Sequence, residues 1–347
     1  MCNIAGYVGS QDAAPLLIEM MKRQSGYGGG YYTGLATIHE GKLYYAKVLG
    51  DVDRLLETTD AAKLPGRIGI LHSRSNSGGD REWAHPFISN DNRLAYVANG
   101  SSGQFFDAEK RDRITRGLER DGFRFSSKAQ VVGRYPVLSD GSGVHVSEAM
   151  CHLVDRHIKA GRTPGEALRC AFLDFPSEIV ALAIHTSTPD RILAARYNQP
   201  MMLARAEDGM YLATSALAFP EKDFYGLDLL PACSSAEITR DGMTMRGFKS
   251  EIPVAQLDAG MYAAATEILL RALDEKHGEP ASPWALMEET KKLWPEGQLA
   301  QSAVLAYETM RPLIKAGRVK MVPVPAPGAP EGQAEGITTT KFLLVKE

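Results

Sequence analysis

The sequence predicts an α+β protein in two parts, on three observations. Short apolar runs bounded by glycine or polar residues, which are typical of strands, dominate residues 2–250. Few of these runs alternate one-to-one with helices, so the order favours an α+β sandwich over a doubly wound parallel sheet. Residues 255–347 instead show three helical patterns followed by a long hairpin, which is the order of a winged-helix module.

The elements of residues 2–250 follow from local patterns. Asn3–Gly9 is too short for a helix and rich enough in Ile, Tyr and Val for a strand. Helices are predicted over Asp12–Gln24, from Ser147 as N-cap through Lys159, and from the capping box that starts at Thr163. We predict two or three helices in this part. Further strands are predicted at Leu35–His39, Lys42–Lys47, Arg67–His72, Arg93–Ala98, Ile179–Ile184, Ile192–Ala195, Met201–Ala204, Met210–Thr214 and Ala236–Ile238.

The C-terminal part has an amphipathic helix at Asp258–Lys276, and further helices are predicted at Trp284–Leu293 and Gln298–Ala316. The hairpin strands are Arg318–Val324 and Thr338–Lys346. Residues 255–347 contain 10 Lys and Arg and 12 Asp and Glu, a net charge of −2. A DNA reader carries a basic face, so a protein contact or a packing role is the better interpretation of this module.

Composition excludes several classes of protein. With 44% hydrophobic and 23% charged residues, the 347-residue chain is neither collagenous nor disordered. The net charge of −3 gives no field that attracts nucleic acid, and no apolar run reaches the ~18 residues that span a bilayer. A secretory signal pattern is absent, and the four scattered cysteines match neither a disulfide framework nor a metal site. We therefore expect a cytoplasmic protein without membrane, metal or cofactor.

Cys2 directly follows the initiator methionine. If Met1 is removed, Cys2 gains an α-amine whose pKa, ordinarily ~7.7–8.0, suits a base near neutral pH. A nucleophile activated by its own amine is a known solution for acyl transfer. Taken alone, Cys2 is better described as a small buried residue at the start of a strand.

Two further segments carry residues suited to amide chemistry. Arg74 leaves a predicted strand into a loop of small polar residues, where a guanidinium can hold a carboxylate in a bidentate manner. Asn99 and Gly100 end another strand, and an Asn amide with a glycine N–H can form an oxyanion hole. Asn-Gly is also the commonest two-residue hairpin turn, so this pair taken alone favours a turn.

Together these segments resemble the class II glutamine amidotransferase domain, the N-terminal-nucleophile glutaminase of glucosamine-6-phosphate synthase and its relatives. The resemblance spans roughly the first 250 residues. It rests on Cys2–Gly9, Thr33–Ala36, His72-Ser73-Arg74, His85-Pro86, Asn99-Gly100, Ser147-Glu148, His152-Leu153 and Leu193–Arg196. It implies a four-layer αββα sandwich, with Cys2 as nucleophile, Asn99 and Gly100 as oxyanion hole, and Arg74 as the clamp on the glutamine α-carboxylate.

The sequence also departs from the family pattern. The acid that holds the α-ammonium of glutamine in the family aligns with Val146, and Asp140 and Glu148 are the nearby candidates to replace it. The segment after Arg74 is Ser-Asn-Ser-Gly-Gly, and a glycine-rich stretch, Gly28–Gly34, replaces the family's Arg-Gly-Tyr-Asp-Ser-Ala-Gly loop. The predicted site comprises Cys2, Asn99 and Gly100 for catalysis and Arg74, Ser75, Ser77, His85, Asp140 and Glu148 for substrate binding.

The leading functional hypothesis is that Cys2 releases ammonia from glutamine or a related amide. An acceptor on another chain would take the ammonia, and the C-terminal module would dock that synthase subunit or build a homodimer. One alternative is a regulatory protein that has lost this chemistry and binds partners through its tail. Another is an amidase for a substrate without an α-ammonium, which accounts for Val146.

Overall fold

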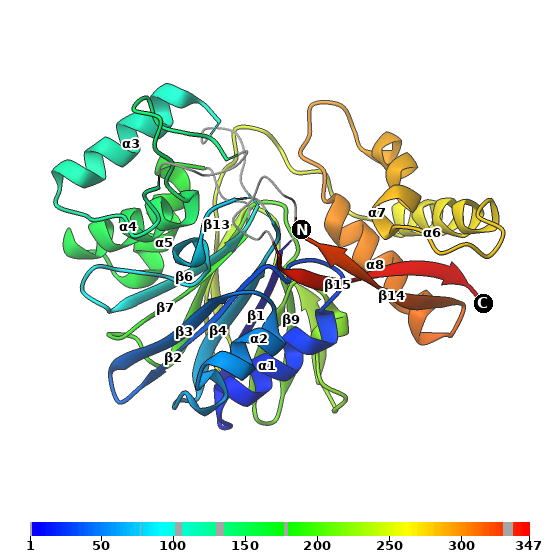
Figure 1. The fold of residues 1–347 in the computed structure, drawn as a ribbon, viewed down its shortest axis with the longest axis horizontal. Coiled ribbons are helices and arrows are strands. Elements are labelled where there is room, and N and C mark those ends of the chain that lie inside the picture. The colour runs from blue at the N-terminus through cyan, green and yellow to red at the C-terminus, as the bar shows by residue number, and fades with distance from the viewer. Residues whose placement is uncertain (1, 77, 101–105, 130–134, 177–179, 329–335) are drawn as a thin grey trace.

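The computed structural model describes residues 2–347 except 77, 101–105, 130–134, 177–179 and 329–335. Thirteen of its strands form two sheets that lie face to face (Figure 1). One sheet contains β1 (Asn3–Gly9), β2 (Tyr32–His39), β3 (Lys42–Leu49), β4 (Ile68–Arg74), β9 (Met202–Ala206), β10 (Gly209–Ala213) and β11 (Gly226–Leu229). The other contains β5 (Phe87–Ile88), β6 (Leu94–Asn99), β7 (Val180–His185), β8 (Arg191–Arg196), β12 (Ser234–Thr239) and β13 (Met243–Gly247).

The strand order is β11-β9-β10-β1-β4-β2-β3 in the first sheet and β13-β12-β8-β7-β6-β5 in the second. Neighbouring strands pair antiparallel, and the N-terminal strand β1 lies between β10 and β4. Ile4 of β1 is opposite His72 of β4. Cys2, just before β1, and Arg74, the last residue of β4, therefore lie at the same end of the sheet. The central position of β1 holds the beginning of the chain in the core of the sandwich.

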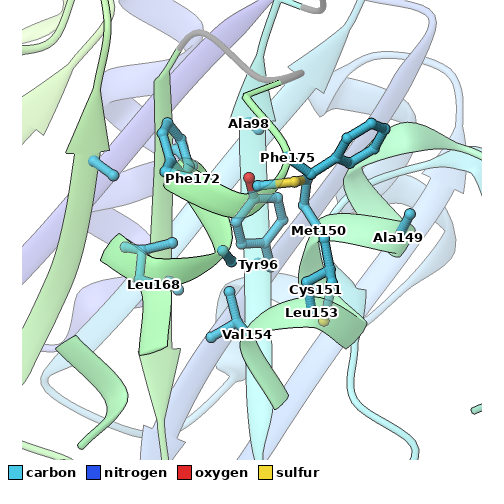
Figure 2. Close-up of a cluster of buried hydrophobic side chains, with 14 of the residues drawn as sticks. Tyr96, Ala98, Ala149, Met150, Cys151, Leu153, Val154, Leu168, Phe172 and Phe175 are labelled. Carbon is cyan, nitrogen blue, oxygen red and sulfur yellow. The ribbon is translucent and has the colours of Figure 1, made fainter. Parts of the chain in front are cut away.

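Helices cover the outer face of each sheet. They are α1 (Ala13–Gln24), α2 (Val52–Thr58), α3 (Ala108–Arg120), α4 (Val146–Lys159) and α5 (Pro164–Asp174). One core lies between the first sheet and α1 and α2, a second between the two sheets, and a third between the second sheet and α3, α4 and α5. Figure 2 shows this third core, where Tyr96 of β6 lies among Met150 of α4 and Phe172 of α5. The layer order is therefore helix, sheet, sheet, helix, as the resemblance implied.

The prediction of two or three helices before residue 250 was wrong, because α2 and α3 were missed. α3 is strongly charged, and only a narrow set of its residues (Arg111, Thr115 and Leu118) is buried, so its apolar signal is weak. The prediction that Ser147 caps α4 was also wrong. His145 is the N-cap, and its Nδ1 accepts a hydrogen bond from the Ser147 N–H at 3.1 Å. The capping box at Thr163 and Glu166 is confirmed.

The C-terminal part contains α6 (Ala259–Asp274), α7 (Pro283–Leu286), a 3₁₀ helix (Glu288–Leu293), α8 (Ser302–Lys315), β14 (Val319–Pro327) and β15 (Thr338–Lys346). The predicted order of three helical segments and a hairpin is thus observed. The middle segment, expected as one helix over Trp284–Leu293, is a single α-turn continued by 3₁₀ geometry. The winged-helix identity of this module stays a prediction. In the described part of the chain, no helix combines the length and the apolar character that a bilayer crossing requires.

Arg196 at the end of β8 joins the sandwich to the C-terminal part. Its side chain is fully buried and donates hydrogen bonds to the carbonyls of Gln199 and Leu230 and to the side-chain carbonyl of Gln301. Gln301 in turn donates to the Ala255 carbonyl at 2.7 Å. One buried guanidinium therefore satisfies acceptors from three separate segments.

We expect Arg196→Ala to lower the free energy of unfolding by about 3–5 kcal/mol, because it leaves these buried acceptors without donors. Arg191 is the matched control, since it lies on the same strand but pairs with Asp190 and Glu237 at the surface. Arg191→Ala should cost at most about 1 kcal/mol. Urea unfolding of both variants measures the difference, and equal losses would contradict the assignment of Arg196 as the tie between the parts.

Candidate active site

Strand alternation brings four of the polar side chains to one end of the space between the sheets. On β1, Ile4 and Val8 face the second sheet, and on β4 Ile68 and Ile70 do so. Because side chains alternate along a strand, Cys2, His72 and Arg74 point to the same inner space. Ala95 and Val97 of β6 face inward as well, so Asn99 joins them from the opposite sheet. The site is built where these strands end.

Cys2 contacts residues from both sheets. Its Sγ lies 3.3 Å from the backbone nitrogen of Ser75, which donates to it, and 3.5 Å from the Ser75 hydroxyl. Its carbonyl accepts a hydrogen bond from Asn99 Nδ2 at 2.9 Å. The predicted nucleophile and the predicted residues Ser75 and Asn99 are therefore adjacent in the structure.

His72 makes the Cys2 thiol acidic. Burial raises the pKa of Cys2, but hydrogen bonding to His72 and the positive charge of that ring lower it, with a further contribution from the Ser75 N–H. The net pKa is about 6. A cysteine with this pKa is mainly thiolate at neutral pH, and the thiolate is the reactive form.

The orientation of the His72 ring is fixed by the opposite sheet. Its Nε2 lies 2.9 Å from the Ala98 carbonyl and 3.0 Å from Asn99 Oδ1. Both of these atoms accept, so Nε2 carries a hydrogen and the plane of the ring is fixed. His72 was quoted in the sequence motif but was not among the predicted site residues. Alternation with Ile68 and Ile70 was the signal that could have found it.

The side chain of Asn99 has three hydrogen-bond partners: the Cys2 carbonyl, the Thr214 hydroxyl and His72 Nε2. Besides the Cys2 carbonyl, its Nδ2 donates to the Thr214 hydroxyl at 3.2 Å, and Thr214 also accepts from the Ile4 N–H at 2.8 Å. Thr214 is thus a second residue that the sequence did not single out. Gly100 follows with φ of 88°, a left-handed conformation that favours glycine, and it is exposed. Asn99 lies beside Cys2, and the oxyanion-hole role of Asn99 and Gly100 stays a prediction.

Arg74 is enclosed by aromatic rings and by the loop that follows it. Its Cζ lies 4.4 Å from the Tyr32 ring centroid and 5.6 Å from that of Trp83, and only 2% of the residue is exposed. Nη2 donates to the Gly78 carbonyl at 2.9 Å. A guanidinium stacked in this way keeps a fixed plane, as bidentate carboxylate binding requires. The predicted residue Ser77 lies outside the described residues.

The ring of His85 packs against the ring of His72. The two rings lie 3.9 Å apart between centroids, and His85 also packs against His145 at 5.1 Å. Burial, together with the positive charges of neighbouring groups such as His72 and Arg74, lowers the pKa of both His85 and His145 well below the usual range. His85 thus packs against the ring of His72, and its predicted contact with substrate stays a prediction.

This neutral histidine pair predicts a loss of stability in acid. Unfolded histidine takes up a proton as the pH falls through ~6.5, whereas folded His85 and His145 do not, so each should cost about 1.4 kcal/mol between pH 8 and pH 5.5. His145→Asn retains a good helix N-cap. Urea unfolding at both pH values should show that His145→Asn removes about 1.4 kcal/mol of this dependence. His39→Asn, at an exposed position, should remove none.

The two carboxylates expected to bind the substrate ammonium have other partners in this structure, and their substrate role stays a prediction. Glu148 is 2% exposed and accepts four hydrogen bonds, from the backbone nitrogens and the hydroxyls of Ser126 and Ser127. Asp140 is exposed and accepts from Arg116 and Ser142. Val146 is the first residue of α4, and its side chain is buried in the core between α4 and the second sheet. Glu148 therefore anchors the 126–127 segment, and Asp140 belongs to a surface ion pair.

Within the described residues, no three His, Cys, Asp or Glu side chains are grouped so that they could hold a metal ion. The chemistry of the site derived below uses only the side chains and backbone groups at the strand ends.

The sequence is similar to a group of aminotransferases that use glutamine. The sequence is 28% identical over 221 residues to a glutamine–fructose-6-phosphate aminotransferase of Bartonella henselae, covering 63% of this chain and 32% of that protein. It is 30% identical over 220 residues to the corresponding protein of Zymomonas mobilis, again covering 63% and 32%. The chain thus spans about a third of the length of these relatives. No family model matches the sequence.

Among solved structures, the fold is similar to that of glutamine phosphoribosylpyrophosphate amidotransferase from B. subtilis. The TM-score is 0.59 at 17% sequence identity, over 89% of this chain and 64% of that one. The sequence relatives and the shared fold together support a class II glutamine amidotransferase domain in this chain.

Proposed function

We propose that this chain hydrolyses a terminal carboxamide through Cys2, after removal of Met1, and supplies the ammonia to an acceptor on another chain. The observation that carries the proposal is the acidic Cys2 thiol, set between His72 and the Ser75 N–H with Asn99 beside it. An acidic, partly exposed thiol is typical of a nucleophilic cysteine and not of a structural one. The similarity to amidotransferases supports glutamine or a related amide as substrate.

The Cys2 thiolate would attack the amide carbonyl carbon, forming a C–S bond and a tetrahedral oxyanion. Asn99 Nδ2 and the Gly100 N–H would donate to this oxygen, with Nδ2 releasing one of its present acceptors. The α-ammonium of Cys2 would protonate the leaving nitrogen, so that the C–N bond breaks and ammonia departs. The resulting amine would take a proton from water, whose attack breaks the C–S bond and restores the thiolate.

A second candidate is an amidase for a substrate that lacks the α-ammonium of glutamine. It is favoured by the surroundings of the three residues expected near the substrate ammonium. Val146 is apolar and buried, and Glu148 and Asp140 are engaged with other partners. A buried ammonium without a counter-charge costs several kcal/mol, so this site would bind glutamine weakly unless another acid serves.

Intact-mass analysis after exposure to a diazo-ketone analogue of glutamine tests the proposal. Untagged protein should lack Met1 and should carry one adduct, which peptide mapping should place on Cys2. Cys2→Ala protein is the control and should remain unmodified. Protein that keeps Met1 and gains no adduct would contradict the proposal, because the catalytic amine would then not exist.

A further inference from the structure

The hairpin formed by β14 and β15 packs on the glycine-rich loop of residues 26–30. The Phe342 N–H donates to the Gly26 carbonyl at 3.0 Å, and the Tyr31 hydroxyl donates to the Ala326 carbonyl at 3.1 Å. A Cβ on Gly26 would lie 2.6 Å from the Phe342 ring. Figure 1 shows this hairpin, in red, extending from the C-terminal helices toward the sandwich.

The same loop rests on the residues that flank the nucleophile and its arginine. Asn3 Nδ2 donates to the Gly28 carbonyl at 3.0 Å, and the Gly30 N–H donates to the Ser73 hydroxyl at 2.8 Å. Gly29 has φ of 68°, and a Cβ there would lie 2.5 Å from the Ser73 carbonyl oxygen. The loop is therefore a thin layer of backbone between the hairpin and the ends of β1 and β4.

Lys341 of β15 lies over this layer. Its Nζ is 3.5 Å from the Gly29 carbonyl oxygen and 5.5 Å from the Tyr31 ring centroid, and the side chain is half-buried. Burial lowers the pKa of Lys341, while the negative charge of the Cys2 thiolate acts in the opposite direction. The ammonium thus belongs to the electrostatic environment of the nucleophile although it lies more than 300 residues away in sequence.

Two cationic side chains near Cys2 do not suit the α-ammonium group of an amino acid. Arg74 and Lys341 both interact with the Cys2 thiolate, and both are cations. Glu148 and Asp140 are engaged with other partners, as described above. The α-ammonium of glutamine would therefore lie near these two cations, and like charges in a partly buried site are unfavourable.

We propose that Lys341 is a specificity-determining residue of the active site, and that the preferred substrate is an amide whose far end is purely anionic. The monoamide of a dicarboxylic acid has this chemistry. Arg74 and Lys341 would together neutralise its carboxylate, and the C-terminal hairpin would be part of the site. This inference rests on the proposed hydrolysis at Cys2 and names the class of amide that is hydrolysed.

Two amides that differ only in the ammonium group test the inference. Ammonia release from glutamine and from 4-carbamoylbutanoate, its analogue without the α-amine, is measured as kcat/KM with the full chain. The wild type should prefer 4-carbamoylbutanoate by about tenfold or more. Lys341→Met should reduce this preference by at least about fivefold, Lys341→Arg should retain it, and Lys341→Glu should shift it furthest toward glutamine.

Lys320→Met is the matched control, because Lys320 lies on the other strand of the hairpin and pairs at the surface with Glu347. It should leave the preference unchanged. A wild-type preference for glutamine, or equal losses on both amides in Lys341→Met and Lys341→Glu, would overturn the inference while leaving the hydrolysis at Cys2 intact. Hydrolysis of neither amide by the wild type would instead overturn the proposed function itself.

Discussion

Replacement of Cys2 by alanine is expected to reduce amide hydrolysis by about 10⁴-fold or more, because the variant has no atom that can form the acyl intermediate. Cys2 directly precedes β1 and is partly exposed, and its side chain interacts with Ser75 and the His72 ring. The variant should therefore retain its fold. Ammonia release and a thermal melt of the same preparation measure the two effects separately.

Cys170→Ala is the matched control for this experiment. Cys170 is also partly exposed, but it lies on α5, on the far side of the second sheet from the nucleophile. Its replacement should leave the rate unchanged. If Cys2→Ala hydrolysed the amide at the wild-type rate, the nucleophile would be another group and the mechanism proposed here would be wrong.

Replacement of His72 by glutamine is expected to raise the pKa of the Cys2 thiol from about 6 toward its ordinary value of ~8.5, because burial would no longer be opposed by the imidazole. In the wild type, thiolate forms as the pH rises through about 6, so reactivity is already near its maximum at pH 7. In His72→Gln, thiolate formation requires higher pH, and the alkylation rate at pH 7 should fall about 30-fold.

The rate of iodoacetamide reaction at Cys2, followed by peptide mass spectrometry between pH 5 and pH 9.5, measures this shift. Cys151 gives an internal comparison, because burial and nearby carboxylates raise the pKa of that thiol well above its usual value. His39→Gln, at an exposed position, should keep the wild-type profile. An inflection that stayed near pH 6 in His72→Gln would show that another group makes Cys2 acidic.

Much of the fold follows from local patterns in the sequence. The run Asn3–Gly9 and the hairpin around Glu40 and Gly41 were predictable, because a short apolar run bounded by glycine and a turn dipeptide are local properties. Arg74, Asn99 and Cys2 were also brought together as predicted, since each ends or precedes a strand that the sequence marks. α3 was missed because most of its residues are polar or charged and only Ile114 and Leu118 are large and apolar.

The surroundings of the predicted site residues were harder to predict. Glu148 was proposed for substrate binding because the acid of the family pattern aligns with Val146 and Glu148 is a nearby carboxylate. Its four hydrogen-bond donors come from residues 126 and 127, some twenty positions earlier, and no local pattern reports such a pairing. Lys341 was missed for the same reason, because its contact with Gly29 depends on how the C-terminal hairpin packs on the sandwich.

Trapping the acyl intermediate tests directly whether Cys2 is the nucleophile. Wild-type protein is mixed with glutamine or 4-carbamoylbutanoate, quenched in acid within milliseconds to seconds, and its N-terminal peptide is analysed by mass spectrometry. We expect a peptide that begins at Cys2 and carries one acyl group in thioester linkage. Amide hydrolysis that proceeds while this peptide remains unacylated, or still begins with Met1, would contradict this role of Cys2.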